Sequence, residues 1–232
     1  KGAIVFNGGD GDDVLTSNTI TVSTFNVVFD GGAGNDAVSA GAERNTLLGG
    51  DGNDLLTSGA GNDLLDGGAG DDALTGGKGN DTSRFAVAET AETDTVKELS
   101  NEGLDLLDFG ALSTAVAINL NSETALATHA NRTVKTAATG TTKFAPNFEN
   151  GTGGDGADSI TGNTSVNSLV GGLGNDTIRG DAGGDILNGG DGDDFLFGDA
   201  GNDTVAGGND DDVLVGDLRG AGATAGSDSL MG

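Results

Sequence analysis

The strongest constraint on this chain is a nine-residue repeat in which Gly and Asp return at fixed positions. From Gly49 onward the sequence reads GGDGNDLLT, SGAGNDLLD, GGAGDDALT and GGKGNDTSR, four blocks that follow one another without a gap. Their shared pattern is GGxGxDxUx, where U is a large apolar residue. One such block is too short to bury its apolar residue, so the copies must stack on one another.

The repeats form two arrays separated by a segment without the motif. In the first array the blocks 8–16, 31–39 and 40–48 precede the four blocks above, and 14 residues separate 8–16 from 31–39. In the second array the register is unbroken from 153 to 215, and a last, interrupted block resumes at Ser227. We therefore predict array 1 over 1–84, an irregular insertion over 85–152, and array 2 over 153–232.

The insertion is richer in Ala and Thr, and alternating runs predict short strands at 94–97, 104–109 and 115–120. We interpret it as irregular β coils that continue the same stack. A separate small domain is the competing interpretation.

Each nonamer divides into a six-residue turn and a three-residue strand. Gly at positions one, two and four permits backbone angles that other residues avoid, and it lets carbonyl groups converge. The apolar residue at position eight points inward. Two nonamers, 18 residues, then make one coil, so we predict an all-β fold, a right-handed parallel β-roll or β-helix.

The acidic charge points to a metal. The formal net charge is -27, and most of the acid is Asp, often beside Gly. With 18 residues per coil, the position-six Asp of one repeat lies beneath the Asp two repeats later. Two carboxylates a few ångströms apart repel each other unless a cation lies between them, and Ca²⁺ prefers six to eight such oxygens.

The same composition excludes other partners. A strongly acidic chain repels phosphate, so we expect no nucleic acid partner. No apolar run approaches the ~20 residues of a membrane span. The chain starts without Met and ends at Gly232, where a new repeat would begin, so we expect it to be a section of a longer protein.

Blocks such as GGAGNDAVS, GGLGNDTIR and GGDGDDFLF resemble the RTX, or haemolysin-type, calcium-binding repeats. This family occurs in bacterial proteins exported by type I secretion. Its members include pore-forming toxins, metalloproteases, lipases, mannuronan epimerases, giant adhesins and S-layer proteins. The resemblance implies an extracellular or cell-surface location and a fold that forms on binding calcium.

The resemblance also implies a ligand set. In the family, one turn supplies the carbonyls of positions two and four and its position-six Asp, and the turn one coil later supplies the carbonyls of positions one and three and its own Asp. In the first array the implied ligands are Gly9, Gly11, Asp13, Gly31, Gly32, Ala33, Gly34, Asp36, Gly49, Gly50, Asp51, Gly52, Asp54, Gly59, Gly61, Asp63, Gly67, Ala69, Asp72, Gly76, Lys78 and Asp81.

In the second array the implied ligands are Gly154, Gly156, Asp158, Gly171, Gly172, Leu173, Gly174, Asp176, Asp181, Gly183, Asp185, Gly189, Gly190, Asp191, Gly192, Asp194, Gly198, Ala200, Asp203, Gly207, Asn209 and Asp212. Together the two arrays would hold about eight calcium ions.

Three places depart from the pattern. Asn45 and Asn167 occupy the Asp position in turns that lack the Gly pair, so we expect weak binding or none there. The interrupted last block leaves the pairing of Asp203 with Asp228 open. Within the insertion, an extra calcium site could be formed by Asp94, Glu102, Asp105 and Asp108, the alternative being solvated acid in β-turns.

Nothing in the sequence indicates catalysis or an organic cofactor. Adjacent Asp pairs recur at several turns, which argues for ligands and against one acid–base dyad. The segment 151–156 matches GxGxxG but lacks a βαβ unit. We expect His129, the single His, to be an ordinary loop or surface residue, and the Phe residues to lie mostly in the core.

Three functions remain open. The chain is a structural scaffold or secretion module, a calcium-dependent segment of an S-layer or adhesin, or a non-catalytic module of a secreted protease, lipase or epimerase. Self-association, or contact with a surface polysaccharide through the parent protein, would accompany the second and third.

Overall fold

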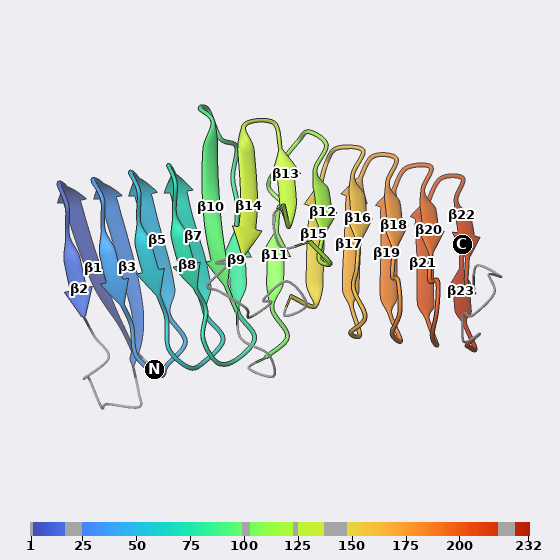
Figure 1. Cartoon of the computed structure of the whole chain (residues 1–232), viewed down its shortest axis with the longest axis horizontal. Coiled ribbons are helices and arrows are strands. Elements are labelled where there is room, and N and C mark those ends of the chain that lie inside the picture. The colour runs from blue at the N-terminus through green and yellow to red at the C-terminus, as the bar shows by residue number, and fades with distance from the viewer. Residues whose placement is uncertain (1, 17–24, 99–102, 123–124, 137–147, 218–225) are drawn as a thin grey trace.

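The chain winds into one continuous roll whose two sheets face each other (Figure 1). The computed structural model describes residues 2–16, 25–98, 103–122, 125–136, 148–217 and 226–232. Every regular element in this part is a strand, which confirms the predicted all-β, mostly parallel roll. Among these residues there is no helix that could span a membrane.

The first sheet has 11 strands, which lie in the order β1 (Gly2–Asp10), β3 (Phe25–Ala33), β5 (Thr46–Asp51), β7 (Leu64–Ala69), β9 (Thr82–Arg84), β11 (Leu106–Asp108), β15 (Asn150–Gly154), β17 (Ser168–Leu173), β19 (Ile186–Asp191), β21 (Thr204–Asn209) and β23 (Ser229–Met231). The second sheet has 12 strands, which lie in the order β2 (Val14–Thr16), β4 (Ala37–Ser39), β6 (Leu55–Thr57), β8 (Ala73–Thr75), β10 (Glu92–Lys97), β14 (Arg132–Thr136), β13 (Ala127–His129), β12 (Ala117–Asn119), β16 (Ser159–Thr161), β18 (Thr177–Arg179), β20 (Phe195–Phe197) and β22 (Val213–Val215). Outside the insertion, successive repeats therefore alternate between the sheets.

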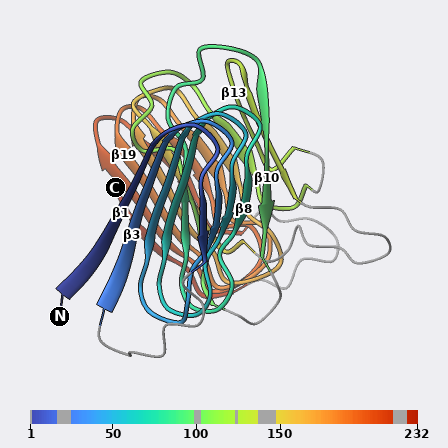
Figure 2. The ribbon, with the colours of Figure 1, turned by 90° about the vertical axis from the view of Figure 1, so that its left-hand side faces the viewer.

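The register confirms one coil per two repeats. Leu47 pairs with Leu65 in the first sheet, and Leu56 pairs with Leu74 in the second, so equivalent residues lie 18 apart. The coil after Thr16 is longer, but it returns to the same register, because Leu15 pairs with Val38. Figure 2, which looks along the roll, shows the coils of the first array superimposed on one another.

The core is made of stacked rows of side chains, one from position eight of each repeat. Leu47, Leu56 and Leu65 are each fully buried, and the same holds in the second array for Leu169, Leu187 and Leu196. Positions seven and nine point outward, because successive side chains of a strand alternate between its faces. Phe195 is therefore 49% exposed, an exception to the expectation that the Phe residues lie mostly in the core.

The insertion continues both sheets before it departs from the pattern. Strand β10 pairs with β8, while β11 pairs with β9 on one side and with β15 on the other. Strands β14, β13 and β12 then fill the second sheet between β10 and β16, and β13 is antiparallel to both neighbours. The three predicted strands correspond to β10, β11 and β12, whereas β13 and β14 were not predicted.

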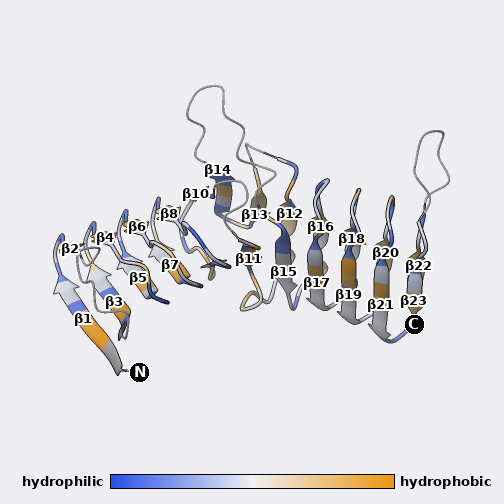
Figure 3. Cartoon of the chain, turned by 90° about the horizontal axis from the view of Figure 1, so that it is seen from below, coloured by the Kyte–Doolittle hydropathy of each residue, from blue (hydrophilic) through white to orange (hydrophobic). Residues whose placement is uncertain are grey.

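These extra strands widen the second sheet where the first sheet has only β11. Seen from below, the strands of the first array are inclined to those of the second, and the change of direction falls at the insertion (Figure 3). The insertion also holds the largest buried side chains, because Phe85, Phe109 and Phe148 are each 1% exposed or less. Phe85 and Phe109 stack with ring centroids 4.8 Å apart.

The interpretation of His129 as a loop or surface residue is wrong. It lies in β13 and is 3% exposed, and its Nε2 lies 2.6 Å from the hydroxyl oxygen of Thr114. Burial lowers the pKa of His129, and the positive charge of Arg132 lowers it further. A lone His gives no pattern from which this position could be inferred.

Successive coils approach each other closely at position two of the repeat. Gly50 has φ 114°, and a Cβ there would clash with the carbonyl of Gly32 in the preceding coil. Gly9 occupies the same position with φ 95°, but a Cβ would find no atom within 4 Å. We expect Gly9→Ala to cost about 1 kcal/mol from the backbone angle alone.

Gly50→Ala must also push two coils apart, so its cost is expected to be at least twice that of Gly9→Ala. Thermal unfolding at a fixed calcium concentration measures both variants. Equal losses for the two variants would contradict the close coil-to-coil packing at position two.

Candidate metal centres in the stacked turns

The position-six side chains form two columns, one on each side of the roll. We call the side where the chain passes from the first sheet to the second the Asp54 side, and the opposite side the Asp63 side. The Asp54 side contains Asp13, Asp36, Asp54, Asp72, Asp94, Asp158, Asp176, Asp194 and Asp212. The Asp63 side contains Asn45, Asp63, Asp81, Asp105, Glu149, Asn167, Asp185, Asp203 and Asp228.

Beyond Asp13, which is the first of its column, one carboxylate oxygen of each Asp in the two columns accepts a hydrogen bond from the neighbouring coil. The backbone N–H of Asp36 donates to Asp54 Oδ1 at 2.7 Å, and the N–H of Asp54 donates to Asp72 Oδ1 at 2.8 Å. The same bond joins Asp203 to Asp228 across the interrupted last block. Each bond fixes the rotation of one carboxylate and aims its second oxygen, Oδ2, into the space between two turns.

The second oxygens are buried without a donor. Within the described residues, no hydrogen bond reaches Oδ2 of Asp13, Asp36, Asp54, Asp63, Asp72, Asp176, Asp185, Asp194 and Asp203. A buried carboxylate oxygen without a partner is costly, and this cost is removed when a cation is bound. Two columns of such oxygens therefore fit a series of cations along the roll.

Backbone carbonyls converge on the same spaces. A Cβ at Gly49 would clash with both Asp54 Oδ2 and the carbonyl oxygen of Gly67, so these two oxygens lie on the same side of Gly49. The same clash occurs at Gly171, where Asp176 Oδ2 and the carbonyl of Gly189 meet. Carboxylate and carbonyl oxygens on one small space are the donor set that hard cations such as Ca²⁺ prefer.

Where Asn replaces Asp, the side-chain amide donates hydrogen bonds to backbone carbonyls. Asn45 Nδ2 donates to the carbonyls of Gly41 and Glu43, which are positions two and four of its own turn. Asn167 Nδ2 donates to the carbonyl of Glu149 at 2.9 Å. These bonds support the expectation of weak binding or none beside the two Asn residues, which stays a prediction.

In the first turn of the second array, unlike in the turns above, the second carboxylate oxygen does have a hydrogen-bond donor. Asp158 Oδ2 accepts a hydrogen bond from the N–H of Gly154 at 2.8 Å, and Oδ1 accepts one from the N–H of Val116. Each oxygen of Asp158 therefore accepts one hydrogen bond and keeps a second lone pair.

Position five forms a second ladder, which the sequence reasoning missed. Asn53 accepts from the N–H of Asp71, and Asn35 accepts from the N–H of Asn53, at 3.0 and 2.8 Å. These side chains are exposed. In each adjacent Asp pair, only the second Asp therefore faces the space between the turns, and the first serves the surface ladder. A short polar residue recurring at position five is the signal that could have predicted it.

The proposed grouping of Asp94, Glu102, Asp105 and Asp108 is wrong. Asp94 lies on the Asp54 side and Asp105 on the Asp63 side, while Asp108 accepts from the N–H of Gly110. Glu102 lies outside the described residues. The insertion nevertheless places acid at position six of both columns.

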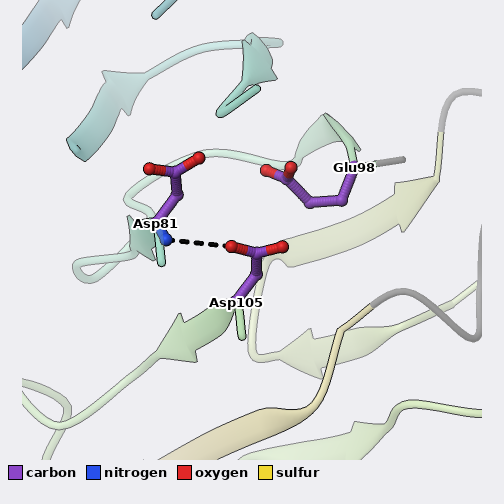
Figure 4. Close-up of side chains that lie close together, drawn as sticks. All are labelled: Asp81, Glu98 and Asp105. Atoms are coloured by element: carbon purple, nitrogen blue, oxygen red, sulfur yellow. Dashed lines mark hydrogen bonds between the residues drawn. The ribbon is translucent and has the colours of Figure 1, made fainter. Parts of the chain in front are cut away.

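Asp105 instead joins Asp81 and Glu98, and ligand atoms of these three buried residues lie within 4.8 Å of one another (Figure 4). Asp81 donates its backbone N–H to Asp105 Oδ1 at 2.9 Å, as in the other coils. Glu98 Oε1 accepts from the N–H of Gly76 at 3.2 Å. Burial, together with the charges of Asp105 and Asp81, raises the pKa of Glu98 to about 9. The cluster prolongs the Asp63 side by one coil beyond Asp81.

Burial raises the pKa of Asp72, Asp176 and Asp185 to about 7, from an ordinary 3.8. Between these values the calcium-free folded chain holds more protons than the unfolded chain, so its stability falls as pH rises through this range. A cation must displace these protons. In the calcium-free chain, protons can take the place of the cation, so we expect this chain to gain β structure as pH falls from 8 to 5.

Far-UV circular dichroism in calcium-free buffer at pH 5 and pH 8 measures this gain. The same spectra at saturating calcium are the control, where little difference is expected. A calcium-free chain that is equally unfolded at both pH values would contradict the raised pKa of these buried carboxyls.

Comparison with known families agrees with this geometry. The model of the RTX calcium-binding nonapeptide repeat matches in four copies, at residues 16–47, 48–82, 152–187 and 179–214. A search of curated proteins finds no match to the chain. RTX repeat domains bind calcium, are generally structural and non-catalytic, and are typical of secreted bacterial proteins. Because the matched residues cover more than half of the sequence, the chain belongs to the RTX calcium-binding nonapeptide repeat family.

Proposed function

We propose that this chain is a structural module that folds around calcium outside the cell. The observation that carries the proposal is the pair of columns of buried Oδ2 atoms that lack a hydrogen-bond donor. In each proposed site, two position-six carboxylates from successive coils face one ion, and carbonyls from the two turns complete its shell. Calcium accepts this mixture of oxygens and tolerates the irregular geometry that backbone carbonyls impose.

We place about eight ions, each between two carboxylates. The pairs are Asp13 with Asp36, Asp36 with Asp54, Asp54 with Asp72, Asp63 with Asp81, Asp158 with Asp176, Asp176 with Asp194, Asp194 with Asp212, and Asp185 with Asp203. The carbonyls are those that the family pattern assigns to the same turns. Eight divalent ions would offset somewhat more than half of the formal net charge of -27.

The proposal includes a division of the chain and a location. Arrays over 1–84 and 153–232 depend on calcium, and the insertion over 85–152 joins them within the same stack. Cytosolic calcium is low, so such arrays stay unfolded until export and fold in a calcium-rich exterior. This behaviour suits a secreted or cell-surface bacterial protein that uses type I secretion. The module acts as a scaffold and has no catalytic role of its own.

A surface-layer or adhesin segment is the second candidate. Several position-seven side chains on the outer face of the second sheet are apolar and exposed, with Val14 80%, Leu55 51% and Val213 45% exposed. Exposed apolar side chains favour self-association or contact with another surface. A non-catalytic module of a secreted protease, lipase or epimerase is the third candidate, and it would place partners such as a polysaccharide on the parent protein.

Equilibrium dialysis against calcium tests the principal proposal. The expected result is about eight ions bound per chain, with little displacement by a tenfold excess of magnesium, which demands a stricter octahedral shell. Binding of one ion or none would overturn the proposal.

Sedimentation velocity separates the first candidate from the second. A monomer at every calcium concentration supports a scaffold module. Calcium-dependent sheets or filaments, with loss of assembly in Leu55→Ser, support the surface segment instead.

A further inference from the structure

The most deeply buried cation of the described residues is Arg132, at the start of β14 in the insertion. Its side chain is 2% exposed. Nη2 donates to the carbonyl of Gly68 at 2.7 Å and forms an ion pair with Glu92 Oε1, while Nη1 lies 3.0 Å from Asp94 Oδ2. The guanidinium also lies over the ring of Phe85, with Cζ 5.5 Å from the ring centroid.

Two of these partners belong to the Asp54 side. Gly68 is position two of its repeat, and Asp94 occupies position six of the next coil, because the N–H of Asp72 donates to Asp94 Oδ1 at 3.1 Å. One coil earlier, Gly50 and Asp72 hold the same two places in the proposed calcium site between Asp54 and Asp72. Arg132 therefore contacts the carbonyl and the carboxylate that an ion between Asp72 and Asp94 would use.

Sheet topology explains how the Arg reaches this place. Strand β14 pairs in parallel with β10, with Arg132 opposite Glu92, so it fills the position in the second sheet where the next coil would lie. It enters through the β13–β14 hairpin rather than through a Gly-rich turn. The column of position-six carboxylates on the Asp54 side stops here and resumes at Asp158.

We propose that Arg132 is a resident cation that replaces one calcium ion in the Asp54 column and holds the insertion together without metal. The inference rests on the proposed function, because it assumes that calcium lies between the other carboxylate pairs. A guanidinium is always charged and donates through a planar fork, so it can bind a carbonyl and two carboxylates at once. Asn45 makes the same kind of replacement with a neutral amide, which donates to the carbonyls of positions two and four.

The insertion has the features of a unit that folds without calcium. It has three large, fully buried side chains, Phe85, Phe109 and Phe148, whereas each array buries about one apolar side chain per repeat. Its acid near Arg132 is partly neutralised from within, because Glu92 binds both the guanidinium and, through Oε2, the N–H of Gly70 at 3.1 Å. Removal of the cation would leave buried carboxylates unpaired, which strongly favours recruitment of another cation or unfolding.

Substitution of Arg132 by a neutral side chain tests the replacement. We expect Arg132→Gln to bind one calcium ion more than the wild type in equilibrium dialysis, because Asp72, Asp94 and Glu92 are then free to hold it. Arg44→Gln is the matched control, since Arg44 is exposed and loses the same charge. The control is expected to bind the same number as the wild type.

An unchanged number of ions in Arg132→Gln overturns the inference, since a purely structural Arg would lower stability equally at every calcium concentration. If the wild type binds no calcium, the proposed function itself is contradicted. Failure of the inference about Arg132 can therefore be distinguished from failure of the proposed function.

If Arg132→Gln does not fold at any calcium concentration, the inference is tested on the wild-type chain in excess chelator. His129 is the single His of the chain and lies buried in β13, so its imidazole proton resonance reports the fold of the insertion. We expect the folded chemical shift to persist in excess chelator. A random-coil shift in chelator would overturn the inference.

Discussion

In excess chelator, both arrays are expected to lose their β structure and expand. At a hundredfold excess of calcium over its dissociation constant, each bound ion stabilises the folded state by about 2.7 kcal/mol. About eight ions would then contribute about 20 kcal/mol, which exceeds the 5–15 kcal/mol by which a folded domain is ordinarily stable. Without the ions, Oδ2 of buried carboxylates such as Asp54 and Asp185 must be desolvated with no hydrogen-bond donor among the described residues.

Far-UV circular dichroism during a calcium titration measures this transition, with magnesium as the control ion. Hydrogen exchange locates it: amides of β5, β6, β17 and β18 are expected to exchange rapidly in chelator, and amides of β13 and β14 slowly. An unchanged β spectrum in chelator at neutral pH, with the same melting temperature, would contradict calcium-driven folding.

Asp54→Asn is expected to remove two calcium ions at once. Asp54 lies in the middle of its column, between Asp36 and Asp72, and each proposed ion is shared by two neighbours. The new amide would donate to the carbonyls of positions two and four, as Asn45 does. Loss of two ions would cost about 5 kcal/mol at a hundredfold excess of calcium.

Two variants control for position and charge. Asp13→Asn, at the end of the column, is expected to lose one ion. Asp71→Asn makes the same charge change at exposed position five, where its oxygen accepts from the N–H of Thr93, so it is expected to lose none. Equilibrium dialysis counts the ions, and equal losses for the three variants would show that the carboxylates act only through net charge.

The regular parts of the fold were predictable because the repeat specifies them locally. Gly at fixed positions sets the turns, and the apolar residue at position eight sets the face of each strand that turns inward. Since both recur every nine residues, stacking Leu47 on Leu65 and Asp36 on Asp54 required no long-range information. The position-six columns were predictable for the same reason, although their role as ligands stays a proposal.

The insertion was only partly predictable because its contacts are not periodic. Alternation located β10, β11 and β12, but nothing local indicated that β14 would lie next to β10 and place Arg132 beside Gly68, 64 residues away. Asp94 and Asp105 were recognised as candidates but were grouped together, because sequence proximity does not reveal that they lie on opposite sides of the roll. Glu98 was missed since it fits no repeat position.

Anomalous X-ray scattering from crystals grown with calcium would locate the ions without assumptions about their ligands. The expected result is a row of peaks between successive position-six carboxylates, from Asp13 to Asp72 and from Asp158 to Asp212, with further peaks at Asp63 with Asp81 and at Asp185 with Asp203. No peak is expected beside Asn45, Asn167 or Arg132. Empty spaces between Asp36, Asp54 and Asp72, with calcium only on exposed acidic side chains, would contradict a roll that is held together by calcium.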